Sequence, residues 1–177
     1  MDFPTFKYHP DPLGTGSIVE SEVRCECCRK ARGYIYTGAI YIPNYFEEKK
    51  ICPWCIANGK AATKFNAEFT STYALQKAGI DPAIILEIGT KTPGYSSFQE
   101  EVWLSHCNGA CAFLGNASKD DVFYIAAHAE VDLVGGEEID DERMLEIAKK
   151  YTLDGGIGIY KFGCLHCNKI MYTFECD

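Results

Sequence analysis

The first third of the chain alternates short runs of strand-forming residues with glycine and proline. Residues 17–24 predict a short strand, and residues 33–38 and 40–42, which are rich in Ile and Tyr, predict strands interrupted by glycine. Residues 44–50 predict a turn or loop that returns the chain toward Ile51. Together these segments predict a ribbon-like hairpin.

The middle of the chain has the residue spacing of helices. Residues 56–74 are rich in Ala, Lys and Phe, with aromatic residues four positions apart, and they predict a helix that packs on the hairpin. A second helix is predicted to begin at Asp81, because an N-cap residue followed by proline is a common helix start. Ser97 with Glu100 predicts a further helix start, although residues 102–104 also fit a strand.

The last part of the chain combines helices with a second hairpin. Residues 120–134 and 140–151 predict helices. Residues 157–162 and 170–174 are rich in strand formers, and they predict two strands joined by a tight turn. The whole pattern predicts an α+β fold in which two hairpin lobes, each resembling a zinc ribbon or knuckle, are separated by helices.

Ten Cys residues are present, and eight of them form four closely spaced pairs. Two Cys separated by two or three residues can direct both thiolates toward one point, so two pairs supply the four ligands of a tetrahedral zinc ion. The pairs are Cys25/Cys28, Cys52/Cys55, Cys107/Cys111 and Cys164/Cys167. We therefore expect two structural Zn²⁺ ions per chain.

The first two pairs flank the N-terminal hairpin in the order C-x2-C-x23-C-x2-C, which is a strong zinc signal. Cys27 lies between two predicted ligands and is expected to be a non-ligand, because choosing it would break the two-residue spacing. Cys176, next to the C-terminus, is also expected to be a non-ligand.

The second predicted site joins the pair at 107 and 111 to the pair at 164 and 167, across 52 intervening residues. This longer separation leaves an alternative open, in which His106 or His166 replaces one thiolate. His106 beside Cys107 also resembles a nucleophile and its base, but adjacent side chains rarely point at each other, so a structural role is favoured.

Length and composition fit an ordered globular protein. The 177 residues suffice for one compact domain or for two lobes, at residues 1–75 and 76–177. Hydrophobic residues make up 47% and aromatic residues 13%, which excludes a disordered chain. A closed site of four thiolates has no open position for a substrate, so no catalytic residues are predicted and we do not expect an enzyme.

Net charge and the expected cellular compartment limit the classes of molecule that this protein is expected to bind. A formal net charge of −8 argues against unaided nucleic-acid binding and favours a basic protein partner. The N-terminus has no basic stretch followed by an apolar run, and no segment approaches the roughly 20 apolar residues that span a bilayer. We therefore expect a cytoplasmic protein without membrane partners, in which reduced Cys pairs hold metal rather than form disulfides.

Two motifs suggest enzymes. Cys52 and Cys55 match the C-x-x-C of thioredoxin-like oxidoreductases, but a second Cys pair precedes them where those folds have a βαβ pattern. His128 and Glu130, followed by the pair at 164 and 167, echo the H-x-E and C-x-x-C order of zinc deaminases, with Gly163 where that signature has Pro. Both remain alternatives, as does a zinc ribbon associated with nucleic acid.

Four segments resemble the CbrC family of bacterial proteins: residues 6–12, 32–38, 51–57 and 159–167. That family often has Cys at the position of His106. The resemblance implies a protein without established enzyme activity that is associated with tolerance to a nuclease colicin. It therefore implies an immunity or toxin-tolerance factor, with a basic nuclease as a partner.

Overall fold

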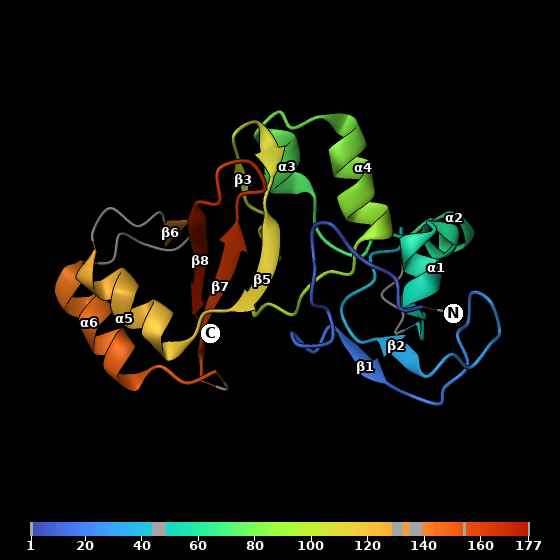
Figure 1. Ribbon diagram of the computed structural model, residues 1–177, viewed down its shortest axis with the longest axis horizontal. Coiled ribbons are helices and arrows are strands. Elements are labelled where there is room, and N and C mark those ends of the chain that lie inside the picture. The colour runs from blue at the N-terminus through green and yellow to red at the C-terminus, as the bar shows by residue number, and fades with distance from the viewer. Residues whose placement is uncertain (1, 44–48, 129–132, 135–139, 154, 177) are drawn as a thin grey trace.

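The computed structural model describes residues 2–43, 49–128, 133–134, 140–153 and 155–176. Figure 1 shows an elongated arrangement, in which a four-stranded sheet lies between a helical pair at one end and the N-terminal hairpin with two short helices at the other. The predicted α+β fold is confirmed. Within the described residues, no helix has the length and apolar character needed to cross a membrane.

The N-terminal hairpin is built from two short antiparallel strands, β1 (Ile18–Glu20) and β2 (Tyr34–Tyr36). Ile18 of β1 and Tyr36 of β2 pack in a cluster with Phe6, Phe69 and the thiols of the first Cys pairs. The predicted ribbon is therefore present, although each strand has three residues rather than the six to eight expected.

The single helix predicted over residues 56–74 is wrong. The segment forms α1 (Pro53–Ala57) and α2 (Lys60–Phe65), and α3 (Tyr73–Lys77) follows only after an irregular stretch. Gly59 and Asn66 have φ values of +70° and +50°, in the left-handed region, where an α-helix cannot continue.

The next helix, α4 (Pro82–Lys91), begins as predicted, because the Asp81 carboxylate accepts a hydrogen bond from the backbone N–H of Ala83 at 2.7 Å. Residues 97–104 form neither the predicted helix nor the alternative strand. Trp103 lies in this irregular stretch with its ring buried, and its indole N–H donates to the carbonyl of Cys111 at 2.9 Å.

The central sheet has the strand order β5–β7–β8–β6. Its strands are β5 (Ala112–Asn116), β7 (Ile157–Gly163), β8 (Ile170–Cys176) and the short β6 (Leu133–Val134). β7 pairs antiparallel with β5 and β8, as the predicted hairpin requires, and β6 pairs parallel with β8. A two-residue hairpin of β3 (Ser105–His106) and β4 (Gly109–Ala110) precedes the sheet.

The two faces of the sheet support separate hydrophobic clusters. Ile159 and Phe174 face α5 (Lys119–Ala127) and α6 (Asp141–Lys150), which pack together on one side of the sheet (Figure 1). Phe162, from the alternate position on β7, packs on the other side with Trp103 and Tyr95. The helix predicted over residues 120–134 is thus too long, since α5 ends at Ala127 and residues 133–134 are strand, whereas the predicted helix at 140–151 is present.

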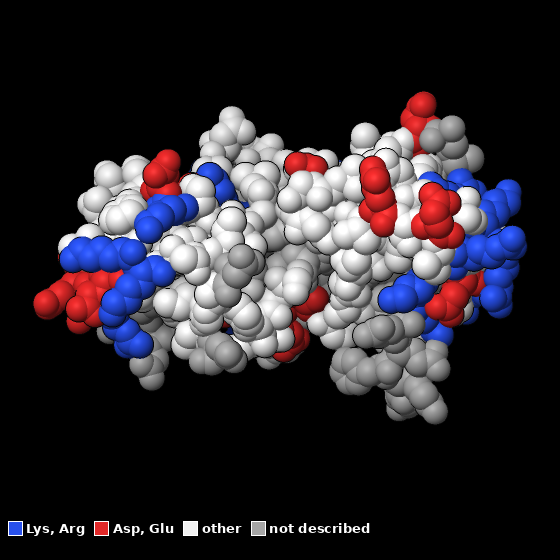
Figure 2. Space-filling view, turned by 90° about the horizontal axis from the view of Figure 1, so that it is seen from below, with Lys and Arg blue, Asp and Glu red and all other residues white. Residues whose placement is uncertain are grey.

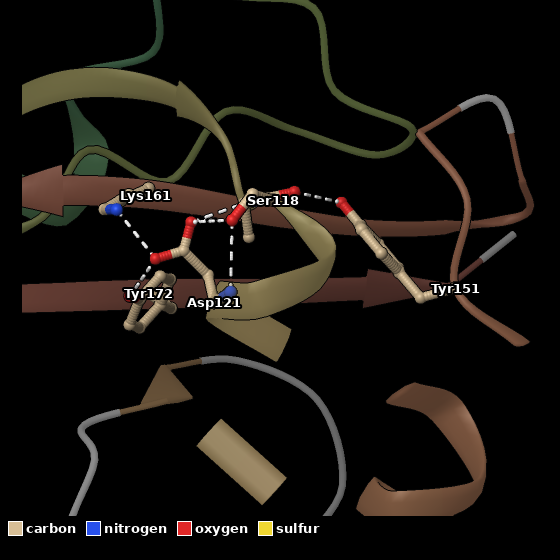
Figure 3. Close-up of polar contacts among 6 residues, drawn as sticks. Ser118, Asp121, Tyr151, Lys161 and Tyr172 are labelled. Carbon is tan, nitrogen blue, oxygen red and sulfur yellow. Dashed lines mark hydrogen bonds and ion pairs between the residues drawn. The ribbon is translucent and has the colours of Figure 1, made fainter. Parts of the chain in front are cut away.

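The start of α5 is tied to the sheet by a polar network around Asp121 (Figure 3). Its carboxylate accepts from the Ser118 hydroxyl at 2.7 Å, the Lys161 ammonium at 2.7 Å and the Tyr172 hydroxyl at 2.9 Å. Burial alone would raise the pKa of Asp121, but these bonds outweigh burial and lower the pKa to about 2. The network is a helix cap joined to a salt bridge, and it fixes α5 against β7 and β8.

The N-terminal segment connects the two ends of the molecule. Phe6 packs in the N-terminal cluster, whereas Tyr8 packs in the central cluster and its carbonyl accepts from Phe113 N–H at 2.8 Å. His9 is fully buried, with Nδ1 2.8 Å from the Pro93 carbonyl oxygen and Nε2 2.7 Å from the Thr15 hydroxyl. Burial lowers the pKa of His9 to about 4, so the imidazole is neutral at pH 7.

Acidification is expected to destabilise the fold through His9. Its pKa is about 4 when folded and about 6.5 when unfolded, so between these values the unfolded chain binds more protons and the unfolding free energy falls as pH falls. The contribution of neutral His9 to the free energy of unfolding is fully present above pH ~6.5 and is lost by pH ~4, for a total of about 3 kcal/mol.

Denaturant unfolding from pH 7.5 to pH 4 checks this expectation. Protonation of metal ligands also destabilises the protein in acid. The relevant quantity is therefore the difference in the free energy of unfolding between the wild type and His9→Gln at each pH. We expect this difference to shrink as pH falls, whereas His128→Gln, at a partly exposed histidine, serves as the control. A constant difference between wild type and His9→Gln would contradict the prediction.

Candidate metal centres

A tight turn places the first Cys pair together. The backbone N–H of Cys25 donates to the Lys30 carbonyl at 3.0 Å, and Arg29 N–H donates to the Cys25 carbonyl at 2.7 Å. Arg29 has a φ of +62°, which reverses the chain immediately after Cys28. The Sγ atoms of Cys25 and Cys28 are thereby directed to the same side of the turn, as in a zinc knuckle.

The second Cys pair is positioned by the start of α1. Cys52 precedes Pro53 at the first helical position, and Cys55 N–H donates to the Cys52 carbonyl at 2.9 Å. Cys28 Sγ lies 3.9 Å from Cys52 Sγ, and the four Sγ atoms of the two pairs all lie within 4.8 Å of one another. The structure therefore brings together all four predicted residues of the first site.

The electrostatics of this cluster favour a bound cation. The hydrogen bond between Cys25 and Cys52 lowers the pKa of Cys25 to about 4 and raises the pKa of Cys52, and burial raises the pKa of Cys55. Thiols in such close contact cannot all lose their protons unless a positive charge compensates them. A soft divalent ion supplies that charge, so the donor set fits a metal.

Arg32 lies outside the four-thiol cluster and supplies part of the positive charge that deprotonated thiols require. A hydrogen bond to Cys28 raises the pKa of its guanidinium, which also lies 5.3 Å from the centre of the Trp54 ring. The ring and the thiol hold the cation beside the site. If four thiolates bind an ion here, this side chain would balance part of their excess negative charge.

The turn at Cys164 repeats the design of the turn at Cys25. Cys164 N–H donates to the Lys169 carbonyl at 2.8 Å, and Asn168 N–H donates to the Cys164 carbonyl at 3.1 Å. Asn168 has a φ of +59° and follows Cys167 directly, as Arg29 follows the second Cys of the first turn. The two candidate centres therefore share one kind of Cys turn, although their sequences differ.

The remaining donors of the second centre come from the β3–β4 hairpin. Cys107 and Asn108 form its two-residue turn, with φ values of +52° and +55°. This turn places His106 Nδ1 3.2 Å from Cys107 Sγ and 3.3 Å from Cys167 Sγ. The expectation that these neighbouring side chains, His106 and Cys107, would not face each other is thus wrong.

The second cluster differs from the predicted one at a single position, because it contains His106 in place of Cys111. The ligand atoms of His106, Cys107, Cys164 and Cys167 all lie within 4.8 Å of one another. Cys111 is fully buried, its N–H donates to the Leu104 carbonyl at 2.9 Å, and burial raises its pKa to about 12. Cys111 therefore lies on the hairpin ladder, away from the turn that presents the ligands.

The two centres differ in exposure. Three of the four thiols in the first centre are buried, whereas Cys107 and Cys167 in the second are exposed. Three thiolates and an imidazole also carry one negative charge fewer than four thiolates. We expect the second centre to exchange its ion with solvent more readily. His166 is exposed and lies outside both clusters, so the alternative of His166 as a ligand has no support in the described residues.

The enzymatic alternatives gain little from the geometry. The pKa of Cys52 and that of Cys55 are raised, whereas a reactive C-x-x-C thiolate requires a lowered value. His128 directly follows the last residue of α5, its Nδ1–H donates to the Tyr124 carbonyl at 2.8 Å, and it belongs to neither thiol cluster. Glu130 lies outside the described residues.

A cavity of about 860 Å³ lies apart from both metal centres, between α2 and α4. Ala62, Ala67 and Leu86 supply apolar lining, and Glu68 and Lys91 add charge. No Cys or His is among its described lining residues, so the cavity does not share the chemistry of either centre.

Comparison with known proteins identifies the family. The family model described as an uncharacterised protein family, UPF0167, matches residues 3–176. The chain belongs to the UPF0167 family. A UPF0167 protein of Pseudomonas aeruginosa is 40% identical over 172 residues, which cover 97% of this chain and 96% of that relative. UPF0167 proteins of Mycobacterium bovis and Mycobacterium tuberculosis are each 38% identical over 166 residues, covering 93% of this chain and 88% of each relative.

These comparisons overturn the resemblance to the CbrC family. The matching family model and the three relatives named above carry the UPF0167 name, and nothing in them indicates CbrC. The expectation of colicin tolerance depended on that resemblance and is left without support. No solved structure matches the UPF0167 chain, so the two metal clusters rest on its own geometry.

Proposed function

We propose that this protein is a binding protein stabilised by two Zn²⁺ ions, which recognises a basic protein partner and carries out no chemistry at its metals. The observation that carries the proposal is the completeness of both clusters, each of which offers four ligand atoms within 4.8 Å. Four protein ligands close a tetrahedral ion, and catalytic zinc sites keep one position open.

The donor types favour zinc over other divalent ions. Thiolates and imidazole are soft or borderline ligands, and small knuckles with this spacing hold Zn²⁺ without redox chemistry. Carboxylates, which Mg²⁺ and Ca²⁺ prefer, are absent from both clusters. Zinc would therefore act at both centres by linking a knuckle to a second segment that is distant in the sequence.

The proposed contact surface for a protein is the outer side of the α5–α6 pair. Phe123 and Tyr124 on α5 are 40% and 53% exposed, so two adjacent aromatic rings are accessible to a partner. Residues 119–150 carry ten Asp and Glu against four Lys and Arg. Exposed aromatic anchors within an acidic region suit a partner with a basic surface.

Affinity purification of the full chain from cells that express it tests this proposal. The expected result is one basic protein recovered in a near-stoichiometric complex that weakens as salt is raised. Phe123→Ala/Tyr124→Ala should abolish the complex, whereas Tyr73→Ala, at a 66% exposed tyrosine on α3, should leave it intact.

Zinc content and circular dichroism must match among the variants for this comparison to hold. Equal recovery of the partner by all variants, or the absence of any stoichiometric partner, would overturn the assignment of this surface.

A further inference from the structure

The positive charge of the chain is concentrated in one segment. Residues 24–64 contain eight Lys and Arg but three Asp and Glu, whereas the whole chain has 17 Lys and Arg against 25 Asp and Glu. Even with the excess negative charge of a zinc ion bound by four thiolates, this segment stays net positive. The net charge of −8, which argued against a polyanionic partner, therefore does not describe this part of the molecule.

Three of these cations lie on the Cys25 turn or on the helix α2 beside it. Lys30 is exposed on the Cys25 turn, and Lys60 and Lys64 are exposed on α2, four positions apart on one side of the helix. The Lys64 ammonium donates to the carbonyls of Glu26 and Cys27 at 3.0 and 2.9 Å, so the helix borders the turn.

We call this surface the basic face. Its cationic residues are Arg24, Arg29, Lys30, Arg32, Lys49, Lys50, Lys60 and Lys64. Figure 2 shows several Lys and Arg side chains at this end of the molecule, with Asp and Glu side chains beside them, and further Lys and Arg side chains at the opposite end. The turn and the helix thus present their charges together, as one surface.

Aromatic rings lie among the cations of the basic face. The Phe65 ring has the ammonium groups of Lys49 and Lys64 at 5.1 and 5.2 Å from its centre, and the partly exposed Trp54 ring has the Arg32 guanidinium at 5.3 Å. A positively charged surface interspersed with aromatic rings is the arrangement that binds single-stranded nucleic acids, in which phosphates meet the cations and bases stack on rings.

The same face offers few exposed apolar anchors to a protein partner besides the partly exposed rings of Trp54 and Phe65. In the described part of this segment, residues 24–43 and 49–64, no large hydrophobic side chain is exposed, and Val23 at its border is the nearest one. Protein interfaces depend on apolar and aromatic anchors that become fully buried, whereas nucleic-acid interfaces are polar and positively charged.

We propose that the basic face around the first metal centre binds the phosphate backbone of single-stranded nucleic acid. This surface is separate from the α5–α6 surface of the proposed function, so either assignment can fail without the other. Binding uses the metal only to fix the turn, and no bond of the nucleic acid is made or broken.

Fluorescence anisotropy of the zinc-loaded full chain with a labelled 20-nucleotide oligouridine tests the proposal. Lys30→Glu/Lys60→Glu should raise Kd by about tenfold or more, because two phosphate contacts become repulsive. Lys119→Glu/Lys149→Glu changes the net charge equally on α5 and α6, and it should change Kd by less than about twofold.

Salt dependence and competing ligands provide the second readout. If about four phosphates are contacted, affinity should fall about 50-fold between 50 and 200 mM salt. Oligothymidine should compete, whereas a duplex of equal length should bind more weakly. Arg24→Gln, a milder change on the same face, should also weaken binding, and it keeps the test valid if the double variant does not fold.

Four outcomes would overturn the proposal. They are the absence of binding at about 100 μM protein in 50 mM salt, equal weakening by the two double variants, tighter binding to the duplex, and binding of polyglutamate without binding of any nucleic acid. The last outcome would assign the basic face to an acidic protein instead.

Discussion

Replacing Cys55 with Ser is expected to remove one of two bound zinc ions and to unfold the N-terminal hairpin. Cys55 is buried in the first centre, and its loss leaves three buried thiols around an ion that needs four ligands. Zinc binding and folding are coupled in small metal sites, with apparent energies of about 10 kcal/mol. Only part of that energy has to be lost to unfold β1 and β2.

Elemental analysis and near-ultraviolet circular dichroism of the purified variant measure this effect. Cys27→Ser is the matched control, because Cys27 lies within the same turn but outside the ligand cluster. We expect two zinc ions per chain in the wild type and in Cys27→Ser, and one in Cys55→Ser. Equal zinc loss in both variants would show that the ligands of the turn are misassigned, and a wild type without zinc would contradict the whole assignment.

Replacing His106 with Ala is expected to release the ion of the second centre, whereas replacing Cys111 with Ala is expected to keep both ions. His106 Nδ1 lies within 3.3 Å of two thiol sulfurs, and Cys111 packs in the central cluster with Trp103. Loss of a ligand should again cost several kcal/mol, but loss of one buried thiol should cost about 1–2 kcal/mol through packing.

Zinc stoichiometry and denaturant unfolding of the two variants separate these effects. His106→Cys is a useful third variant, because a thiolate at this position can replace the imidazole as a ligand and should retain the ion. Retention of two ions in His106→Ala together with loss of one in Cys111→Ala would restore the ligand set expected from Cys spacing alone.

Cysteine spacing predicts the thiol turns well, because each zinc knuckle is formed by residues that are close in the sequence. The C-x2-C pairs at 25 and 164 fold into tight turns whose hydrogen bonds lie within six residues, so the sequence indicates them directly. The structure brings together the four thiols that the first site requires, and their binding of zinc stays a prediction. The division into lobes at residues 75 and 76 and the cytoplasmic location also stay predictions.

The choice between Cys111 and His106 depended on backbone geometry that spacing does not reveal. A C-x3-C pair can share one metal if it is helical or loops back, but residues 105–110 form a two-residue hairpin turn. Cys111 pairs with Leu104 on that hairpin ladder, while His106 and Cys107 lie at the turn. Asn108, which accepts positive φ more readily than most residues, was the available signal for such a turn.

The helix predicted over residues 56–74 failed for a similar reason. Ala, Lys and Phe favour a helix on average, but Gly59 and Asn66 stop it through left-handed backbone conformations. Net charge is also an average, because it combines an acidic α5–α6 region with the basic face around the first centre. Local counts along the sequence would have separated the two.

The N-terminal segment has a consequence for synthesis of the chain. His9 leaves the ribosome early, but its partner Pro93 lies 84 residues further on, and Phe113, whose N–H donates to Tyr8, follows later still. The N-terminal segment therefore cannot take its final place until more than half of the protein has been translated. Nascent or truncated chains would leave Tyr8 uncovered, which makes them targets for chaperones and proteases.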